Sequence, residues 1–185
     1  AAGKTPLGLY RLLVRAFRKK QADFSGATFI ELDEYIGCGY RDSFAFSLRK
    51  NFISKVNFRK ENVFMFDGNA KNTAAECGKF DSLVNQKGID LMILGIGANG
   101  HIAYNEPGTS FLSGTHAVKI SARTMKARGK KFFGRTPSSA ITMGMKQIMS
   151  AKRVVLMAGG RKKADAVAKA LKGRPSMKVP ASVLQ

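Results

Sequence analysis

The sequence predicts an α/β protein built on a parallel sheet with helices on both faces, and three observations lead to this expectation. Short, continuous apolar runs alternate with longer segments in which apolar residues recur at helical spacing. Glycine, proline and capping residues separate the two kinds of segment. No internal repeat or low-complexity linker divides the chain, so its 185 residues are expected to form one domain around a single core.

The expected helices carry recognisable start and stop signals. The first begins at Pro6, because proline is tolerated in the first turn of a helix, and its apolar residues Leu9, Leu12, Leu13 and Phe17 are expected on one stripe. Thr73 and Glu76 have the spacing of a capping box and predict a helix start, and Gly88 ends that helix. Similar patterns predict helices over residues 6–20, 43–54, 73–86, 139–149 and 162–171.

The expected strands are short and apolar, and they cover residues 28–32, 63–66, 89–94, 116–120 and 153–158. Strands that alternate with helices favour a parallel, open, Rossmann-like sheet. Ligands of such sheets bind at the carboxyl ends of the strands. This rule selects three places for a site: Asp33-Glu34, Gly95 to Glu106, and Gly159 to Lys163.

Composition and segment lengths disfavour several classes of protein. No apolar run approaches the ~20 residues that cross a bilayer, and the first residues lack the order of a secretory signal. We therefore expect a cytoplasmic protein with no membrane partner. Cys38 and Cys77 are far apart and the chain has only 2 histidines, which disfavours a disulfide framework and a zinc site, so no metal is expected.

The charge of the chain is strongly positive and unevenly distributed. In total, 32 Lys and Arg residues against 12 Asp and Glu residues give a formal net charge of +20. Residues 1–106 hold 15 basic and 11 acidic residues, whereas residues 107–185 hold 17 basic residues and one acidic residue, Asp165. A basic half indicates an anionic partner, either a phosphorylated small molecule or a nucleic acid, unless it is only a solvated face.

Residues 95–100, with the letters GIGANG, fit the dinucleotide-binding pattern G-x-G-x-x-G after a strand. That mechanism needs a helix that begins at the glycines and an acidic residue about 20 positions later. Pro107 and Gly108 interrupt a helix here, and no Asp or Glu occurs between Glu106 and Asp165. A nicotinamide site is therefore disfavoured.

The same loop carries side chains that can move protons. His101, Asn105 and Glu106 lie on one short segment at the expected carboxyl end of a strand. A histidine titrates near neutral pH, with an unperturbed pKa of ~6.5, and a nearby carboxylate can support it in acid–base catalysis. The alternative is a histidine that only satisfies hydrogen bonds in a tight turn. The position in the expected fold favours the catalytic interpretation.

The string LGIGANGHIAYNEPGTSF, residues 94–111, resembles the signature of the glucosamine-6-phosphate deaminase family and its isomerase relatives, in the version with Asn in the GIGxNGHI loop. Five further segments resemble the family in the same order along the chain: GKTPLGLY (3–10), FIELDEYIG (29–37), ENVFMFDGNA (61–70), SAITMGMKQIMSAK (139–152) and VPASVLQ (179–185). The resemblance extends over essentially the whole chain.

The resemblance implies a cofactor-free reaction that converts glucosamine 6-phosphate to fructose 6-phosphate and ammonia. The sugar ring opens, a proton leaves C2 to give an enolamine, the proton returns at C1, and water releases ammonia. By this resemblance Asp33 is the base at C2 and His101 opens the ring. Glu106 pairs with His101 and orients it, and Asn99 keeps the loop in register.

The resemblance also assigns residues that bind the substrate and its phosphate: Gly3, Lys4, Thr5, Gly97, Gly100, Lys131 and Lys163. The segment of residues 3–5 matches a phosphate loop, in which backbone N–H groups ahead of a helix face the anion. Lys131 stands where relatives have Arg, and a Lys supplies a point charge without the bidentate fork, so looser phosphate binding is expected. Glu34 and Tyr35 are interpreted as structural residues.

The resemblance also marks where the chain departs from the family. Residues 1–185 are expected to form one sugar-phosphate isomerase/deaminase-like domain without the family's N-terminal strand and helix and its C-terminal strand and helix. The stretch 121–131 matches the family poorly, and no allosteric control is expected. Phe132 and Phe133, which follow it, match core positions.

Three other interpretations are left open. A catalytically impaired family member that binds sugar phosphate is favoured by Lys131 and by Lys4, which replaces a small residue. A nucleic-acid-binding protein would use the basic half, but no recognised RNA- or DNA-binding motif is present. A phosphogluconolactonase-like hydrolase shares the fold but is expected to lack the LDEY base and the HIAYNE string. The main expectation is a deaminase whose partner is a sugar phosphate, and a homo-oligomer is left open.

Overall fold

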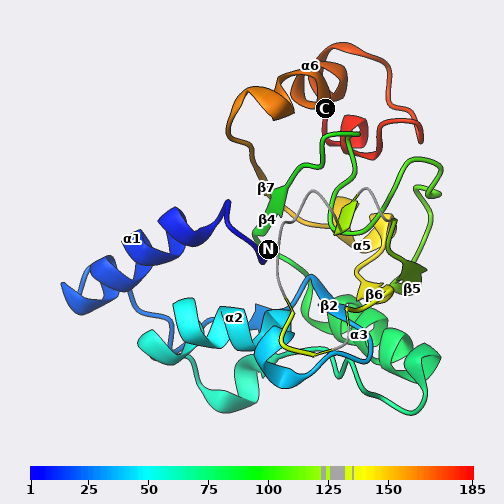
Figure 1. The fold of residues 1–185 in the computed structure, drawn as a ribbon. Helices are drawn as coiled ribbons and strands as arrows, with labels where there is room; N and C mark the ends of the chain where they lie inside the picture. The colour runs from blue at the N-terminus through cyan, green and yellow to red at the C-terminus, as the bar shows by residue number, and fades with distance from the viewer. Residues whose placement is uncertain (122–123, 126–131, 135) are drawn as a thin grey trace.

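A computed structural model describes residues 1–121, 124–125, 132–134 and 136–185, and both helices and strands occur along its whole length (Figure 1). Its α-helices are α1 (Leu7–Arg18), α2 (Phe44–Asn51), α3 (Thr73–Lys87), α5 (Met145–Met149) and α6 (Ala164–Lys172). None of these described helices is both long and apolar enough to cross a membrane. The strands are β1 (Phe29–Ile30), β2 (Asp33–Tyr35), β3 (Val63–Phe64), β4 (Met92–Gly95), β5 (His116–Lys119), β6 (Ser139–Thr142) and β7 (Val154–Met157).

The parallel strands form two pairs within the described residues. β1 pairs with β3, and β4 pairs with β7, as expected for an α/β protein with helical crossovers. Gly95 lies opposite Met157, so the carboxyl ends of β4 and β7 share one edge. The loop that runs from Gly95 to Glu106 and the turn that leads to Lys163 therefore start from the same edge.

β2, β6 and β5 form an antiparallel sheet, which the sequence analysis did not predict. β6 is its central strand, and Thr142 lies opposite Asp33 on one side and opposite His116 on the other. Asp33 is therefore held in a paired strand, whereas the sequence analysis placed it just past one.

The prediction of one helix over 139–149 is wrong for its first part. Residues 139–142 form β6, since their backbone groups pair with two strands and the β-branched Ile141 and Thr142 suit a strand. Tertiary pairing overrides the apolar spacing that indicated a helix. The helix that remains is α5, and Gly144 is its N-cap residue.

The start of α3 also differs from its prediction. Asn72 caps the helix by accepting a hydrogen bond from the Ala75 N–H at 2.9 Å. The predicted capping box does not form, because the Glu76 carboxylate accepts the Asp67 N–H at 3.0 Å instead. The end of the helix is as predicted, with Gly88 at a positive φ of 68°.

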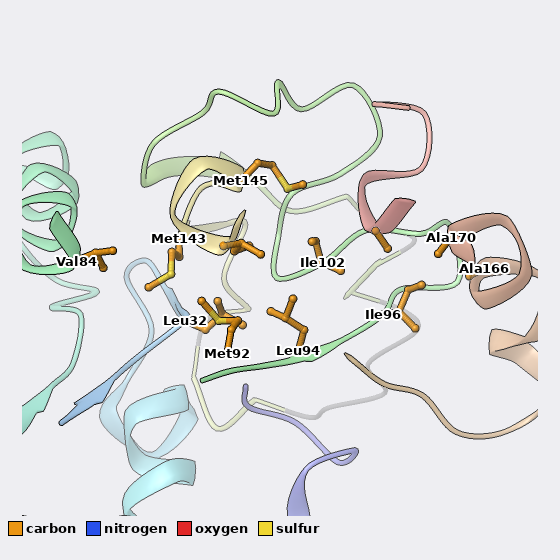
Figure 2. Packing of buried hydrophobic residues seen from close by; sticks show 12 residues of the cluster. Leu32, Val84, Met92, Leu94, Ile96, Ile102, Met143, Met145, Ala166 and Ala170 are labelled. Atoms are coloured by element: carbon orange, nitrogen blue, oxygen red, sulfur yellow. The ribbon is translucent and has the colours of Figure 1, made fainter. Parts of the chain in front are cut away.

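The largest buried apolar cluster connects β4 with α5 and α6 (Figure 2). Leu94 and Ile102 are fully buried in it, so the residue that follows His101 anchors its loop in the core. Burial of one side chain of this size stabilises a fold by about 1.5–3 kcal/mol. The buried members are Leu32, Val84, Met92, Leu94, Ile96, Ile102, Met143, Met145, Ile148, Ala166, Ala170 and Ala181.

Phe132 and Phe133 were both expected in the core, and the structure separates them. The Phe132 ring packs edge-on against Tyr35, with ring centroids 5.4 Å apart. The expectation for Phe133 is wrong, because this residue is 87% exposed. Its backbone is nevertheless tied down, since the Phe133 N–H donates to the buried Asp42 carboxylate at 3.0 Å.

Candidate active site

The segment after β4 folds back on itself through two glycines. The Gly97 N–H bonds to the His101 carbonyl at 2.8 Å, and Gly100 has a positive φ of 85°, which favours glycine. A Cβ at Gly97 would lie 2.3 Å from the His101 ring, and one at Gly100 would lie 2.6 Å from Val179 Cγ1. Both glycines, predicted as substrate-binding residues, shape the loop, and Gly97 leaves room for the imidazole.

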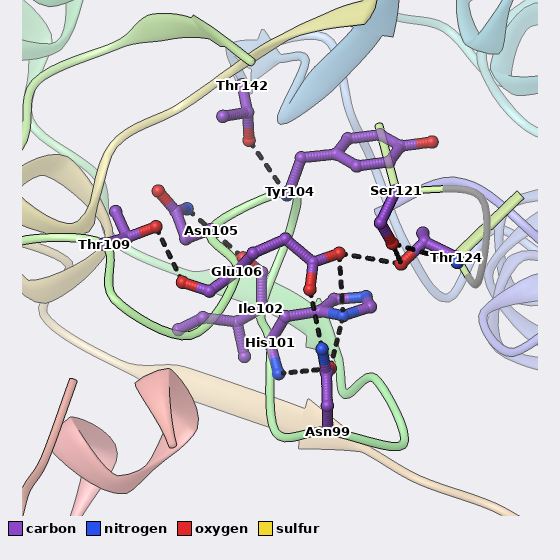
Figure 3. Close-up of polar contacts among 10 residues, drawn as sticks. All are labelled: Asn99, His101, Ile102, Tyr104, Asn105, Glu106, Thr109, Ser121, Thr124 and Thr142. Atoms are coloured by element: carbon purple, nitrogen blue, oxygen red, sulfur yellow. Dashed lines mark hydrogen bonds and ion pairs between the residues drawn. The ribbon is translucent and has the colours of Figure 1, made fainter. Parts of the chain in front are cut away.

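Asn99 connects His101 with Glu106 inside this loop (Figure 3). Its Nδ2 donates to Glu106 Oε2 at 2.6 Å, and its Oδ1 lies 2.7 Å from His101 Nδ1. The same Oδ1 accepts the His101 backbone N–H at 3.3 Å. Glu106 Oε1 lies 3.4 Å from His101 Nδ1. The structure therefore brings His101 together with Glu106, which was expected to orient it, and with Asn99, which was expected to keep the loop in register.

These contacts determine which nitrogen of a neutral His101 carries the hydrogen. The orientation of the Asn99 amide follows from two partners, because the His101 N–H needs an acceptor and the Glu106 carboxylate needs a donor. The amide oxygen that faces Nδ1 can only accept, so Nδ1 is protonated. Nε2 is then an unprotonated base that can take a proton from a substrate hydroxyl.

Glu106 is held as an anion. The hydrogen bond from His101 is the largest cause that lowers the pKa of Glu106 to about 2, and bonds from Thr124 and Asn99 add to it while burial opposes it. Thr124 Oγ1 donates to Glu106 Oε1 at 2.7 Å. An ionised Glu106 stabilises the imidazolium that forms when Nε2 takes up a proton.

Thr124 is the part of this cluster that the sequence analysis missed. It lies in the stretch 121–131, whose match to the family is poor, and no local pattern relates it to the loop of Glu106. The one sequence signal is its spacing from Ser121, whose Oγ accepts the Thr124 N–H at 3.1 Å as in a helix cap.

Asp33 belongs to the framework that supports the His101 loop. It is 5% exposed in β2 and lies opposite Thr142 of β6. The Thr142 hydroxyl accepts a hydrogen bond from the Tyr104 N–H at 3.1 Å. Strand β6 therefore links the strand of Asp33 to the loop that carries His101.

Two further polar residues hold the backbone around the site. The Glu34 carboxylate accepts the N–H groups of Phe44 and Ala45, each at 2.9 Å, and so secures the start of α2. Burial raises the pKa of Glu34, although these bonds oppose the shift. The buried Asn105 amide donates to the Met143 carbonyl at 2.9 Å. The structural role expected of Glu34 agrees with this geometry.

Glu31 is a buried acid that the sequence analysis did not single out. It is 1% exposed, and one oxygen accepts the Phe66 N–H at 2.9 Å. Its other oxygen has no hydrogen-bond partner within the described part of the chain. Burial, followed by the charge of Glu34, raises the pKa of Glu31 well above its usual range. Despite this acidic cluster, no three His, Cys, Asp or Glu side chains among the described residues could hold a metal ion.

The residues predicted to bind phosphate lie on separate segments. Gly3, Lys4 and Thr5 are exposed just before α1. Lys163 is half-buried at the start of α6, and burial lowers its pKa. Lys131 lies outside the residues that the structure describes.

Solved structures share this fold. A monomeric glucosamine-6-phosphate deaminase superposes with a TM-score of 0.94 at 39% identity, over 99% of this chain and 78% of the other. A 6-phosphogluconolactonase from Thermotoga maritima superposes with a TM-score of 0.75 at 20% identity, over 98% of this chain and 76% of the other. The chain therefore has the α/β fold common to these two classes of protein.

The chain belongs to the family described as glucosamine-6-phosphate isomerases/6-phosphogluconolactonase, which matches residues 1–185. It is 43% identical to the glucosamine-6-phosphate deaminase of Halalkalibacterium halodurans, over 100% of this chain and 77% of the relative. The deaminase of Thermoanaerobacter sp. (strain X514) is 42% identical, over 100% of this chain and 75% of the relative. The deaminase of Clostridium acetobutylicum is 39% identical, over 100% of this chain and 79% of the relative.

Proposed function

We infer that the chain is a glucosamine-6-phosphate deaminase, which converts glucosamine 6-phosphate and water to fructose 6-phosphate and ammonia. The observation that carries this inference is the contact set in which Asn99 and Glu106 leave Nε2 of His101 as the free base. Relatives of this name that match the whole chain, at 39% to 43% identity, support it. The reaction belongs to amino-sugar catabolism, and we propose a cytoplasmic location for it.

Opening of the sugar ring is the step that His101 supports. Its Nε2 takes the proton of the C1 hydroxyl, and the same proton is delivered to the ring oxygen as the bond between C1 and that oxygen breaks. The product is the open-chain aldehyde. Glu106 and Asn99 stabilise the imidazolium that exists between the two proton transfers.

Asp33 supports the isomerisation that follows. Its carboxylate takes the proton from C2, which the neighbouring aldehyde acidifies, and an enolamine forms. Return of the proton to C1 gives an imine at C2, water adds to this imine, and ammonia leaves. The paired strand and the burial of Asp33 favour a fixed position of the carboxylate, which lowers the barrier to proton transfer.

Phosphate binding is proposed for the segments identified from the sequence. Gly3, Lys4 and Thr5 precede α1, where backbone N–H groups favour an anion. Lys163 follows β7, whose carboxyl end shares an edge with the His101 loop, so a sugar phosphate can extend from one to the other. Lys131 is proposed as a third phosphate ligand.

The test is to incubate the purified chain with glucosamine 6-phosphate and to follow ammonia and fructose 6-phosphate together. Equimolar release is expected, with loss in Asp33→Asn and retention in Asp90→Asn, a matched change of an exposed carboxylate that pairs with Lys152. Absence of both products from a folded chain would contradict the proposal. A parallel assay with 6-phosphogluconolactone distinguishes a lactonase, which would release acid but no ammonia.

A further inference from the structure

Within the described part of the chain, one partner of the Glu106 carboxylate comes from outside its own loop. Oε2 receives Asn99 Nδ2 at 2.6 Å, and Oε1 receives Thr124 Oγ1 at 2.7 Å, whereas His101 Nδ1 is more distant from Oε1, at 3.4 Å. Among the described residues, Thr124 is therefore the short hydrogen-bond donor to the oxygen that faces His101. Thr124 is 8% exposed, so water competes little for this bond.

The direction of the Thr124 hydroxyl is determined by Ser121. Ser121 Oγ donates to Thr124 Oγ1 at 2.9 Å and accepts the Thr124 N–H at 3.1 Å. Because Thr124 Oγ1 already receives one hydrogen, its own hydrogen is available for Glu106 (Figure 3). The bonds run in one direction from Ser121 through Thr124 to Glu106, and such chains strengthen each other.

The hydrogen bond from Thr124 affects the His101 base through the Glu106 carboxylate. The terminal torsion of a glutamate is broad, so the two short bonds, from Asn99 to Oε2 and from Thr124 to Oε1, are what hold the plane of the carboxylate. If Thr124 stopped donating, Glu106 Oε1 could rotate away from His101 Nδ1 and would lose part of the stabilisation of its anion. Rotation of the carboxylate would also disturb the bond from Asn99 Nδ2 to Glu106 Oε2, which sets the amide orientation that keeps the hydrogen of His101 on Nδ1.

We propose that Thr124, oriented by Ser121, is a positioning residue for the deaminase reaction: it holds Glu106 in the orientation that keeps the hydrogen of His101 on Nδ1. The proposal rests on the proposed function for its effect on turnover, while the geometry of the His101 ring can be tested without turnover. If the Thr124 hydroxyl had only a structural role, its removal would leave the kcat and the pH profile of the folded chain unchanged.

The experiment compares Thr124→Val, which keeps the shape and removes the hydroxyl, with Thr124→Ser, which keeps the hydroxyl. Thr124→Val should lower kcat by about ten- to a hundredfold, the range for loss of a hydrogen bond to a charged group, with KM within about threefold of the unchanged chain. Since the bond from Thr124 helps to lower the pKa of Glu106, its loss should raise that pKa and move the acidic limb of the pH profile to higher pH. Thr124→Ser should restore most of kcat, and Ser121→Ala should cause a smaller loss than Thr124→Val.

Unchanged kcat and pH profile in Thr124→Val would overturn the proposal. Equal loss in Thr124→Val and Thr124→Ser would overturn it too, since packing of the methyl group would then explain the effect. If the unchanged chain releases no ammonia, the proposed function fails, and nitrogen NMR of the His101 ring decides the positioning role separately. Thr124→Val should then reduce the Nδ1-protonated form relative to Thr124→Ser, and an identical ring signal in both would contradict the role.

Discussion

Gly97 lies against the imidazole of His101 so closely that a Cβ built on it would be 2.3 Å from both Cε1 and Nδ1 of the ring. The glycine and the ring belong to the same turn, which the Gly97 N–H closes by bonding to the His101 carbonyl. The backbone thus limits the ring on one side, while Asn99 holds Nδ1 by a hydrogen bond. Absence of a side chain at Gly97 is a condition for the observed position of the base.

Gly97→Ala should therefore impair catalysis more than folding. The new methyl group displaces the His101 ring, and a misplaced base costs about 10²-fold in kcat. Gly95→Ala is the matched control, because among the described residues no atom beyond its two chain neighbours lies within 4 Å of a Cβ at Gly95. Steady-state kinetics and thermal melting of both variants check this. Equal kcat in the two variants would show that the His101 ring can move aside without loss of activity.

The variants Asn99→Leu and Asn99→Asp should separate two effects: the orientation of the His101 ring by Asn99, and the consequence of a negative charge next to Glu106. A Leu side chain cannot accept a hydrogen bond from His101 Nδ1, so kcat should fall by about 10²-fold or more. Asp keeps an acceptor for Nδ1, but it places a carboxylate oxygen where Nδ2 now donates to Glu106 Oε2 at 2.6 Å. Two carboxylates so close share a proton, so the acidic limb of the pH profile should move up by about one unit or more. A pH–rate profile of each variant is the measurement, and an unshifted Asn99→Asp profile contradicts this interpretation.

Lys163→Met should raise KM for glucosamine 6-phosphate with a smaller change in kcat. Lys163 is half-buried at the start of α6, and the burial that lowers its pKa also strengthens its attraction for an anion. Its neighbour Lys162 is exposed, so Lys162→Met is the matched control for loss of one charge. Removal of one phosphate contact should raise KM by about tenfold or more. The same KM in both variants would show that Lys163 does not bind the phosphate of the substrate.

Glu31 should make the fold less stable as the pH rises. Burial raises its folded-state pKa above the usual value of about 4.5, so above that value the unfolded chain releases this proton more readily than the folded chain does. Stability is therefore lost between the unfolded-state pKa and the raised folded-state pKa. Glu31→Gln cannot ionise, and its oxygen can still accept the Phe66 N–H that Glu31 accepts now.

The measurement for Glu31 is the melting temperature of both chains between about pH 4 and pH 8, a range that spans the unfolded-state titration. The melting temperature of Glu31→Gln should rise relative to that of the unchanged chain as the pH increases. A difference that stays constant over this range, or that reverses, would show that Glu31 does not carry the expected titration.

The loop of His101 could be predicted because its chemistry is local. Asn99, His101 and Glu106 lie within eight consecutive residues of one strand–loop segment, and the structure brings them together through short-range contacts. The helices α1 and α3 could also be predicted, although Asn72 rather than Thr73 caps α3. In α1 the buried residues are Tyr10 and Val14, whereas Leu12 of the expected stripe is 63% exposed, because tertiary packing decides which face is covered. The strand β6 could not be predicted, because its formation depends on pairing with two strands elsewhere in the chain.

The sequence by itself determined the alternation of helices with the parallel strands β1, β3, β4 and β7, the position of the His101 loop at the end of β4, and the family to which the chain belongs. Only the tertiary structure decided that Thr124 would donate to Glu106 and that Thr142 would link Asp33 to the loop of His101. Hydrogen bonds between distant residues require an exact distance and direction, which depend on how strands pair and layers pack. The spacing of residues along the sequence does not determine these distances and directions.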